Sequence, residues 1–133
     1  MVAVIIAVLV AASVVTVLEL NLFNIVNHPS DDYFTIVMSD QGFNSSKARY
    51  PTPWPVMNVR KGDKVSIHVE NDDPGGEPHA FVITHYFPSG IKLAGGQSDD
   101  IIFTANQAGS FLVYCNILCT PHTYMLNGQL NVT

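Results

Sequence analysis

Basic residues are scarce in this chain. Six Lys and Arg stand against eleven Asp and Glu, which gives a formal net charge of -5. Proteins that bind nucleic acid present clustered basic side chains to the phosphates, so this balance argues against a nucleic-acid partner. Charged residues make up only 13% of the 133 residues and apolar residues 47%, an unusual composition for a purely soluble protein. The apolar excess therefore indicates a membrane-associated segment.

Charge is absent altogether from residues 1–18, which are nearly all Val, Ala, Ile and Leu. Glu19 interrupts the run, and residues 20–26 continue mostly apolar. A bilayer core needs about 20 such residues, and a rise of about 1.5 Å per residue lets residues 2–23 reach roughly 33 Å as a helix. A cleaved signal peptide is the rival interpretation, but no Lys or Arg precedes the run, and the run is long for a signal peptide. We predict a transmembrane anchor at residues 1–26.

Cysteine occurs only twice, as Cys115 and Cys119. A disulfide between them would close a very short loop and add little stability, so a disulfide framework is disfavoured. Both thiols instead share one short stretch, residues 115–125, with His122 and Met125. Thiolate, thioether and imidazole are ligands that copper selects, and a weak axial Met is a mark of copper electron-transfer sites. This stretch therefore predicts a copper site.

Turn residues punctuate the chain after the predicted anchor. Residues 27–32 form a short polar linker with a turn signal at its His-Pro step. Residues 33–133 then contain short apolar or alternating runs between Gly, Pro, Asn and Asp clusters, which is typical of a β-sandwich. A region of this length can bury a core without disulfides. The segment between 84 and 96 is expected to be a loop, and the expected strands are 33–38, 56–60, 64–70, 78–84, 100–105, 110–115 and 128–132.

Strand periodicity places two of the candidate ligands inside the sandwich. Side chains alternate between the two faces of a strand, so Cys115 shares a face with Val113, and His79 shares a face with Phe81. Since Val113 and Phe81 are expected in the core, Cys115 and His79 also point inward, each at one end of its strand. We expect these two strand ends to meet in a half-buried pocket that the loop 116–125 closes.

The cysteine-containing stretch is similar to the copper loops of cupredoxins in two ways. Cys115-x3-Cys119, followed by a His and then x2-Met, resembles the binuclear CuA loop of cytochrome oxidase subunit II. The usual CuA loop has three residues between its second Cys and its His, whereas this chain has two. Taken alone, Cys119-Thr-Pro-His122-x2-Met125 resembles the mononuclear blue-copper loop of amicyanin. The resemblance implies an all-β, Greek-key cupredoxin sandwich at residues 33–133, preceded by the predicted N-terminal transmembrane helix.

Each version of the resemblance implies its own ligands. In the CuA version two thiolates bridge two copper ions, each ion takes one imidazole, and a thioether and a backbone carbonyl are weak further ligands. The implied set is His79, Cys115, Ile117 through its carbonyl, Cys119, His122 and Met125. In the blue-copper version one type 1 copper ion binds His79, Cys119, His122 and Met125, and Cys115 is a bystander. The second cysteine, carried on a four-residue extension, favours the CuA version.

The CuA resemblance implies a membrane-anchored electron-transfer subunit, subunit II of a haem-copper terminal oxidase such as cytochrome c oxidase. It would accept electrons from an external donor, a cytochrome c or a small blue copper protein, and pass them to haem in subunit I. The chain would hold neither the haem nor the oxygen-reducing site. We expect a single-pass protein of the cell membrane with its copper domain on the outer face. Two alternatives stay open: a membrane-tethered mononuclear carrier similar to amicyanin or plastocyanin, and a protein without redox function, such as a copper chaperone or a metal-free adhesion domain.

Overall fold

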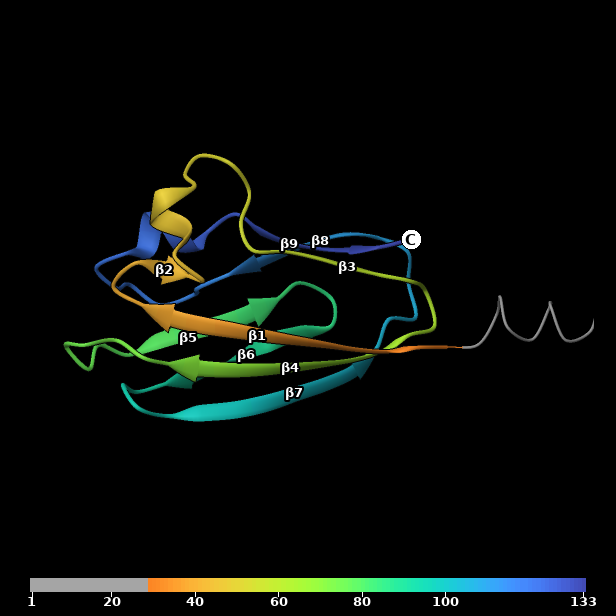
Figure 1. The fold of residues 1–133 in the computed structure, drawn as a ribbon, viewed down its shortest axis with the longest axis horizontal. Coiled ribbons are helices and arrows are strands. Elements are labelled where there is room, and N and C mark those ends of the chain that lie inside the picture. The colour runs from red at the N-terminus through yellow and green to blue at the C-terminus, as the bar shows by residue number, and fades with distance from the viewer. Residues whose placement is uncertain (1–28) are drawn as a thin grey trace, which may run out of the picture.

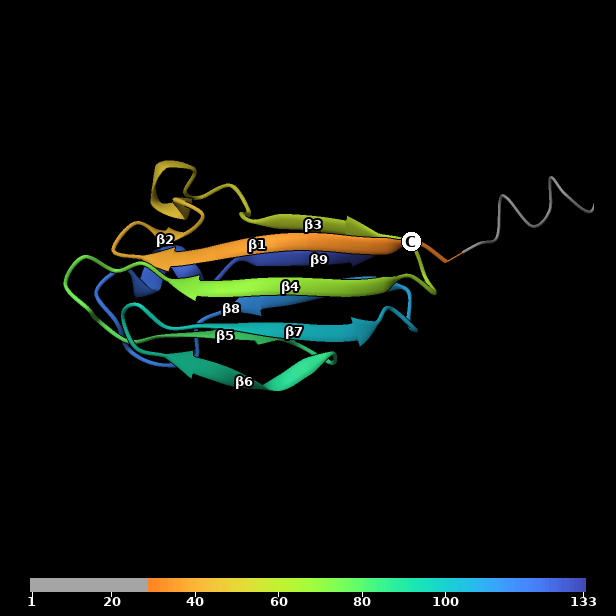
Figure 2. The ribbon, with the colours of Figure 1, turned by 60° about the horizontal axis from the view of Figure 1, so that its bottom comes forward.

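Two β-sheets stacked face to face make up residues 29–133, the part of the chain described by the computed structural model (Figure 1). The strand order is β2-β1-β4-β7 in one sheet and β3-β9-β8-β5-β6 in the other. Figure 2 shows the two layers from a second direction. The strands are β1 Asp31–Ser39, β2 Gly42–Phe43, β3 Val56–Val59, β4 Lys64–Asn71, β5 His79–Ile83, β6 Phe87–Leu93, β7 Ser98–Thr104, β8 Gly109–Tyr114 and β9 Gly128–Val132, with short 3-10 turns η1 Ser46–Ala48 and η2 His122–Met125. The predicted all-β sandwich is confirmed.

The core lies between the sheets and follows the alternation of the strands. Val65, Ile67 and Val69 of β4 are fully buried, while the residues between them keep some exposure. In the other sheet every residue of β5 is buried, because β5 is paired on both sides, with β8 and β6. Phe81 of β5 packs edge to face against Phe43 of β2 with the ring centroids 5.8 Å apart, which joins the two layers.

One predicted loop is a strand in the structure. The segment between 84 and 96 contains Pro88 and Gly90, which are turn signals, yet β6 runs through both of them. Its only paired neighbour is β5, so β6 is an edge strand, where a proline costs no hydrogen bond of the sheet. Gly90 has a positive φ of 67° and lies against Val82, where a Cβ would come within 2.6 Å of a methyl carbon. The glycine therefore permits the strand rather than ending it.

The N-terminal boundary also differs from the expectation. Strand β1 begins at Asp31, so the last two residues of the predicted linker pair with Lys64 and Val65 of β4. The predicted transmembrane anchor, residues 1–26, lies outside the residues that the structure describes. Within residues 29–133 no helix is long and apolar enough to cross a membrane.

A buried carboxylate ties the start of β1 to the turn before β4. Asp63 is 3% exposed, and its carboxylate accepts the backbone N–H groups of Ser30 and Arg60, each at 2.9 Å. These hydrogen bonds, that from Ser30 foremost, outweigh burial and lower the pKa of Asp63 to about 2. Burial, together with contact with Asp63, raises the pKa of neighbouring Asp32 instead. The two carboxyl groups should therefore affect stability in opposite directions.

Replacing Asp63→Asn should lower the free energy of unfolding at pH 7 by about 1–2 kcal/mol, less than the full pKa shift because the amide oxygen can still accept one of the backbone N–H groups. A carboxyl group with a lowered folded-state pKa stabilises the fold above its unfolded pKa, and that contribution is lost as the pH falls through about 2. Urea denaturation across pH 2 to 7 should thus show the variant and the parent converging in acid. Asp32→Asn is the matched control and should leave stability at pH 7 unchanged or raise it; an equal loss in both variants would contradict the assignment.

Candidate metal centre

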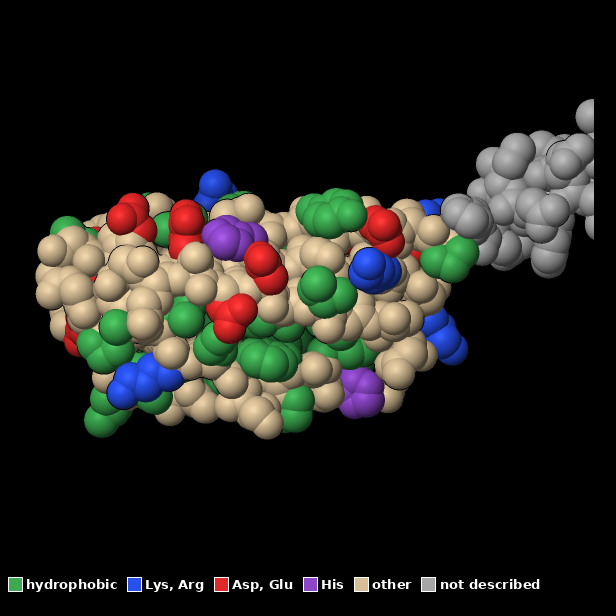
Figure 3. Space-filling view, turned by 90° about the horizontal axis from the view of Figure 1, so that it is seen from below, with side chains coloured by type: hydrophobic (Ala, Val, Ile, Leu, Met, Phe, Trp, Pro, Cys, Tyr) green, Lys and Arg blue, Asp and Glu red, His purple; other side chains and the backbone are tan. Residues whose placement is uncertain are grey.

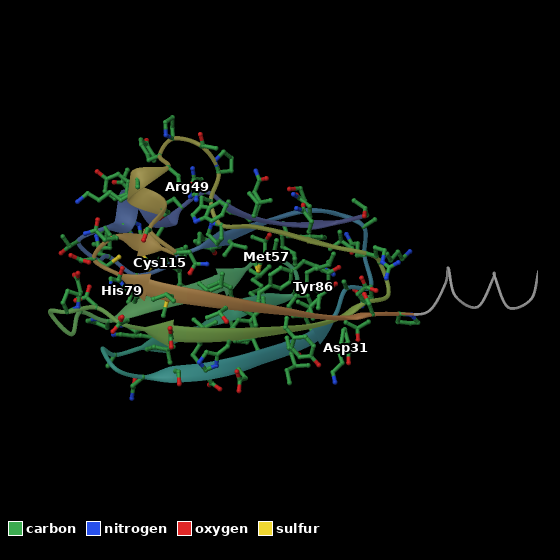
Figure 4. The ribbon with its side chains drawn as sticks, in the orientation of Figure 1. Asp31, Arg49, Met57, His79, Tyr86 and Cys115 are labelled. Atoms are coloured by element: carbon green, nitrogen blue, oxygen red, sulfur yellow. The ribbon has the colours of Figure 1, made fainter. Side chains whose placement is uncertain are left out.

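The predicted ligands gather at one end of the sandwich. His79 is the first residue of β5, and Cys115 directly follows the last residue of β8. Because β5 and β8 pair in antiparallel fashion, the start of one strand lies beside the end of the other. Figure 4 shows His79 and Cys115 at the same end of the molecule, away from Asp31 and Tyr86. The remaining candidates lie on the following loop and on η2.

Cys119 is the centre of a cluster of sulfur and nitrogen atoms. Its Sγ lies 3.9 Å from Cys115 Sγ, 3.9 Å from His122 Nδ1 and 3.9 Å from Met125 Sδ. Both cysteines are free thiols, and a disulfide would need its sulfurs about 2.05 Å apart. A metal–thiolate bond of about 2.3 Å lets one ion bind two sulfurs at the observed separation. The donor set therefore fits a soft metal ion such as copper or zinc.

His79 has one ring nitrogen without a partner. The side chain is fully buried, and its Nε2 lies 3.0 Å from Asp73 Oδ2. Its Nδ1 is also buried and has no hydrogen-bond partner among residues 29–133. A buried polar atom left unsatisfied is costly, so such an atom in a native fold calls for a ligand or another explanation. The backbone N–H of the next residue, Ala80, donates to Cys115 Sγ at 3.4 Å, so this strand end adjoins the sulfur cluster.

The structure does not bring all four nitrogen and thiol donors into one tight group. The donor atoms of Cys115, Cys119 and His122 lie within 4.8 Å of one another, whereas His79 is grouped with Asp73 and Glu77. The carbonyl of Ile117, the predicted backbone ligand, accepts a hydrogen bond from Cys115 Sγ at 3.3 Å. His79, Cys115 and Met125 are each at most 1% exposed, whereas Cys119 and His122 are partly exposed, so the donors together are half-buried, as expected.

Contacts from outside the loop hold the ligand stretch in place. The Cys115 N–H donates to the carbonyl of Met125 at 2.8 Å, which closes the loop on itself. The Glu77 carboxylate accepts the Thr120 N–H at 3.0 and 3.1 Å, and the Ser46 hydroxyl donates to the carbonyl of Tyr124. Since an internal hydrogen bond and contacts from two other segments fix the loop, its donors are arranged before any ion binds.

Burial controls the protonation of the second thiol. Desolvation, followed by the proximity of Cys115, raises the pKa of Cys119 to about 12. The thiol is therefore protonated at neutral pH in the metal-free protein, and a metal ion must displace that proton.

The pKa of Asp73 is lowered. Burial acts to raise it, but the hydrogen bond from His79 and those from the backbone of Glu77 and Gly75 outweigh burial.

Sequence reasoning missed two acidic residues at the site: Asp73, which contacts His79, and Glu77, which accepts hydrogen bonds from Thr120 of the ligand loop. Both belong to a Gly- and Pro-rich segment that looks like an ordinary surface loop. A carboxylate a few residues before a candidate metal-binding His was the available signal, since such histidines usually donate their second N–H to an acid or a carbonyl. The other described histidines lie elsewhere: His68 Nδ1 is 2.7 Å from Asp100 on the sheet surface, and His85 is exposed, in the turn after β5, at the opposite end of that strand from His79.

Comparison with known proteins finds likeness in structure alone. No protein-family model matches the sequence, and no curated protein sequence matches it significantly. The structure is similar to a multicopper oxidase, with a TM-score of 0.60 and 24% identity over 77% of this chain and 42% of that one. It is similar to the copper nitrite reductase of Nitrosomonas europaea, with a TM-score of 0.57 and 19% identity over 77% of this chain and 41% of that one.

A small protein shows the same likeness over nearly its whole length. The dithionite-reduced auracyanin of the photosynthetic bacterium Roseiflexus castenholzii aligns with a TM-score of 0.56 and 16% identity, over 76% of this chain and 96% of that one. This chain spans less than half the length of the multicopper oxidase and the nitrite reductase but nearly all of the auracyanin. Together these neighbours show that residues 29–133 have the cupredoxin fold, as predicted.

Proposed function

We propose that this chain is a copper electron-transfer protein, and specifically the CuA-bearing subunit II of a haem-copper terminal oxidase. The observation that carries the proposal is the position of Cys115. Its Sγ is buried, lies 3.9 Å from Cys119 Sγ and points to the carbonyl of Ile117. A bridging thiolate must lie beside the second thiol and face the other donors, and Cys115 meets this requirement.

The residues take distinct roles in the proposed centre. Cys115 and Cys119 would bridge two copper ions, His79 and His122 would each bind one of them, and Met125 and the Ile117 carbonyl would be the weak ligands. When bound, such a pair supplies a one-electron carrier whose charge is spread over two metals. The chain buries His79, Cys115 and Met125 and holds the donors in one arrangement, which limits the structural change that accompanies electron transfer.

The mononuclear alternative has its own supporting observation. His122 Nδ1 and Met125 Sδ both lie 3.9 Å from Cys119 Sγ, so three of the four ligands of a type 1 site, Cys119 among them, lie together. Under this alternative the chain is a membrane-tethered electron carrier with one copper ion, and Cys115 is not a ligand of that ion.

Charge distribution supports a cationic electron donor. Residues 29–133 contain ten Asp and Glu against six Lys and Arg, and one of the basic side chains, Lys47, lies beside Tyr124 of the ligand-bearing turn η2. Figure 3 shows acidic side chains spread along one face of the molecule, from the end at which Figure 4 places His79 and Cys115 to the opposite end, with basic side chains between them. A cytochrome c or small blue copper protein with a basic surface is therefore the proposed donor. Subunit I, holding the haem, is the proposed acceptor, with residues 1–26 anchoring the chain and its copper domain on the outer face of the cell membrane.

Copper content and electron paramagnetic resonance test the proposal directly. The copper-loaded protein should contain two copper ions per chain, and its spectrum should show the hyperfine pattern of one unpaired electron shared by two copper nuclei. One copper ion per chain with the pattern of a single nucleus would establish the mononuclear alternative instead. A chain that binds no copper would contradict both the binuclear proposal and the mononuclear alternative.

A further inference from the structure

The carboxylate of Asp73 lies directly behind the imidazole of His79. The Asp73 side chain is 3% exposed, and its Oδ2 is 3.0 Å from His79 Nε2. Its other oxygen, Oδ1, accepts the backbone N–H groups of Gly75 at 2.8 Å and Glu77 at 3.2 Å. Its two backbone partners are donors, which favours an ionised carboxylate, and an ionised carboxylate can only accept from the ring nitrogen that faces it.

A carboxylate at this position determines which nitrogen of the ring carries the proton. Because Asp73 accepts from Nε2, the neutral imidazole of His79 keeps its proton there and presents a lone pair at Nδ1. That second nitrogen is buried and has no partner among the described residues. The ring is therefore both oriented and held in the tautomer that a metal ion requires.

The rest of the loop prevents the carboxylate from moving. The Asn71 amide donates to the carbonyls of Glu77 at 2.8 Å and Leu93 at 2.9 Å. The Asn71 side-chain oxygen accepts the N–H of Asp73 at 3.0 Å. Asn71 therefore connects the backbone of Asp73 to Leu93 of β6, and these hydrogen bonds do not involve His79.

We propose that Asp73 is the positioning residue of the metal centre: it fixes the His79 ring with Nδ1 available to copper and sets the reduction potential through its buried negative charge. The proposal rests on the proposed function, in that His79 is taken to be a copper ligand. A buried anion behind an imidazole makes the ring a stronger donor and favours the more positively charged, oxidised metal. Asp73 therefore lowers the reduction potential and strengthens metal binding.

Three variants separate position from charge. Asp73→Asn keeps the size of the side chain and an oxygen acceptor but removes the charge, while Asp73→Ala removes both. Asp72→Asn is the matched control, because it removes the same charge from the adjacent residue, which is exposed. The measurements are the reduction potential and copper affinity of the loaded full-length protein, and the ¹⁵N chemical shifts of the His79 ring in the metal-free protein.

The expected results differ between the variants. Asp73→Asn should raise the reduction potential clearly more than Asp72→Asn does, with copper content unchanged. Asp73→Ala should weaken copper binding by about 10- to 100-fold, and its His79 ring should lose the single Nε2–H tautomer seen in the metal-free parent. If Asp73→Ala fails to fold, the difference in reduction potential between Asp73→Asn and Asp72→Asn tests the proposal by itself.

Failure of this inference is distinguishable from failure of the proposed function. A parent protein that binds copper, with Asp73→Asn and Asp72→Asn giving the same potential, would overturn the role of Asp73 and leave the copper centre intact. A metal-free parent whose His79 carries its proton on Nδ1 would overturn it as well. A parent that binds no copper would instead remove the function on which the inference rests.

Discussion

Replacing Cys115→Ser should reduce the copper content from two ions to about one per chain and abolish the shared-electron hyperfine pattern. A hydroxyl is a hard, poor substitute for a bridging thiolate, so at most one copper should remain on Cys119 and His122. The fold should survive, because serine can still accept the Ala80 N–H and donate to the Ile117 carbonyl as the thiol does. Copper analysis and electron paramagnetic resonance on the same sample measure both effects.

Cys119→Ser is the companion variant. Its sulfur lies next to Cys115, His122 and Met125, so its loss should remove nearly all tightly bound copper under either ligand set. Under the mononuclear alternative, by contrast, Cys115→Ser should leave one copper ion and an intense thiolate-to-copper absorption. A Cys115→Ser protein with the parent's spectrum and copper content would refute the CuA assignment, and with it most of the case for an oxidase subunit.

Replacing Phe81→Ala should cost about 3–5 kcal/mol of stability, a large share of the roughly 5–15 kcal/mol available to a typical domain. Phe81 is fully buried, and its ring meets Phe43 of the opposite sheet at a centroid distance of 5.8 Å. The cavity would open two residues from His79 on the same strand, so metal binding should weaken along with the fold. Chemical denaturation with and without copper measures the loss.

Tyr33→Ala is the control for the removal of an aromatic ring. Tyr33 is 73% exposed, so its truncation should change stability by no more than about 0.5 kcal/mol. Equal effects of the two substitutions would mean that Phe81 does not lie in the core between the sheets, and the strand alternation that places His79 inward would then be wrong.

Local patterns were sufficient for most of the strands and for the spacing of the thiols. Strand β9 has the predicted bounds, Gly128–Val132, and β4 differs from the predicted strand by one residue. The two-residue period that identified them is a property of neighbouring residues, and it also predicted correctly that Cys115 and His79 point inward. Strand β6 was missed because its Pro and Gly signal a turn locally, whereas its strand conformation comes from pairing with β5.

The sequence by itself determined the sandwich and the set of soft donors, since both the apolar–polar alternation of the strands and the Cys-His-Met spacing are local patterns of neighbouring residues. Only the tertiary structure decided what surrounds those donors. The Asn71 hydrogen bond that anchors the loop of Asp73 reaches Leu93, 22 residues away, and Glu77 reaches Thr120 across 43 residues. Such contacts depend on how the two sheets and their loops come together, so no local pattern predicts them. The structure alone therefore shows that Asp73 lies beside His79 and that Glu77 lies beside Thr120.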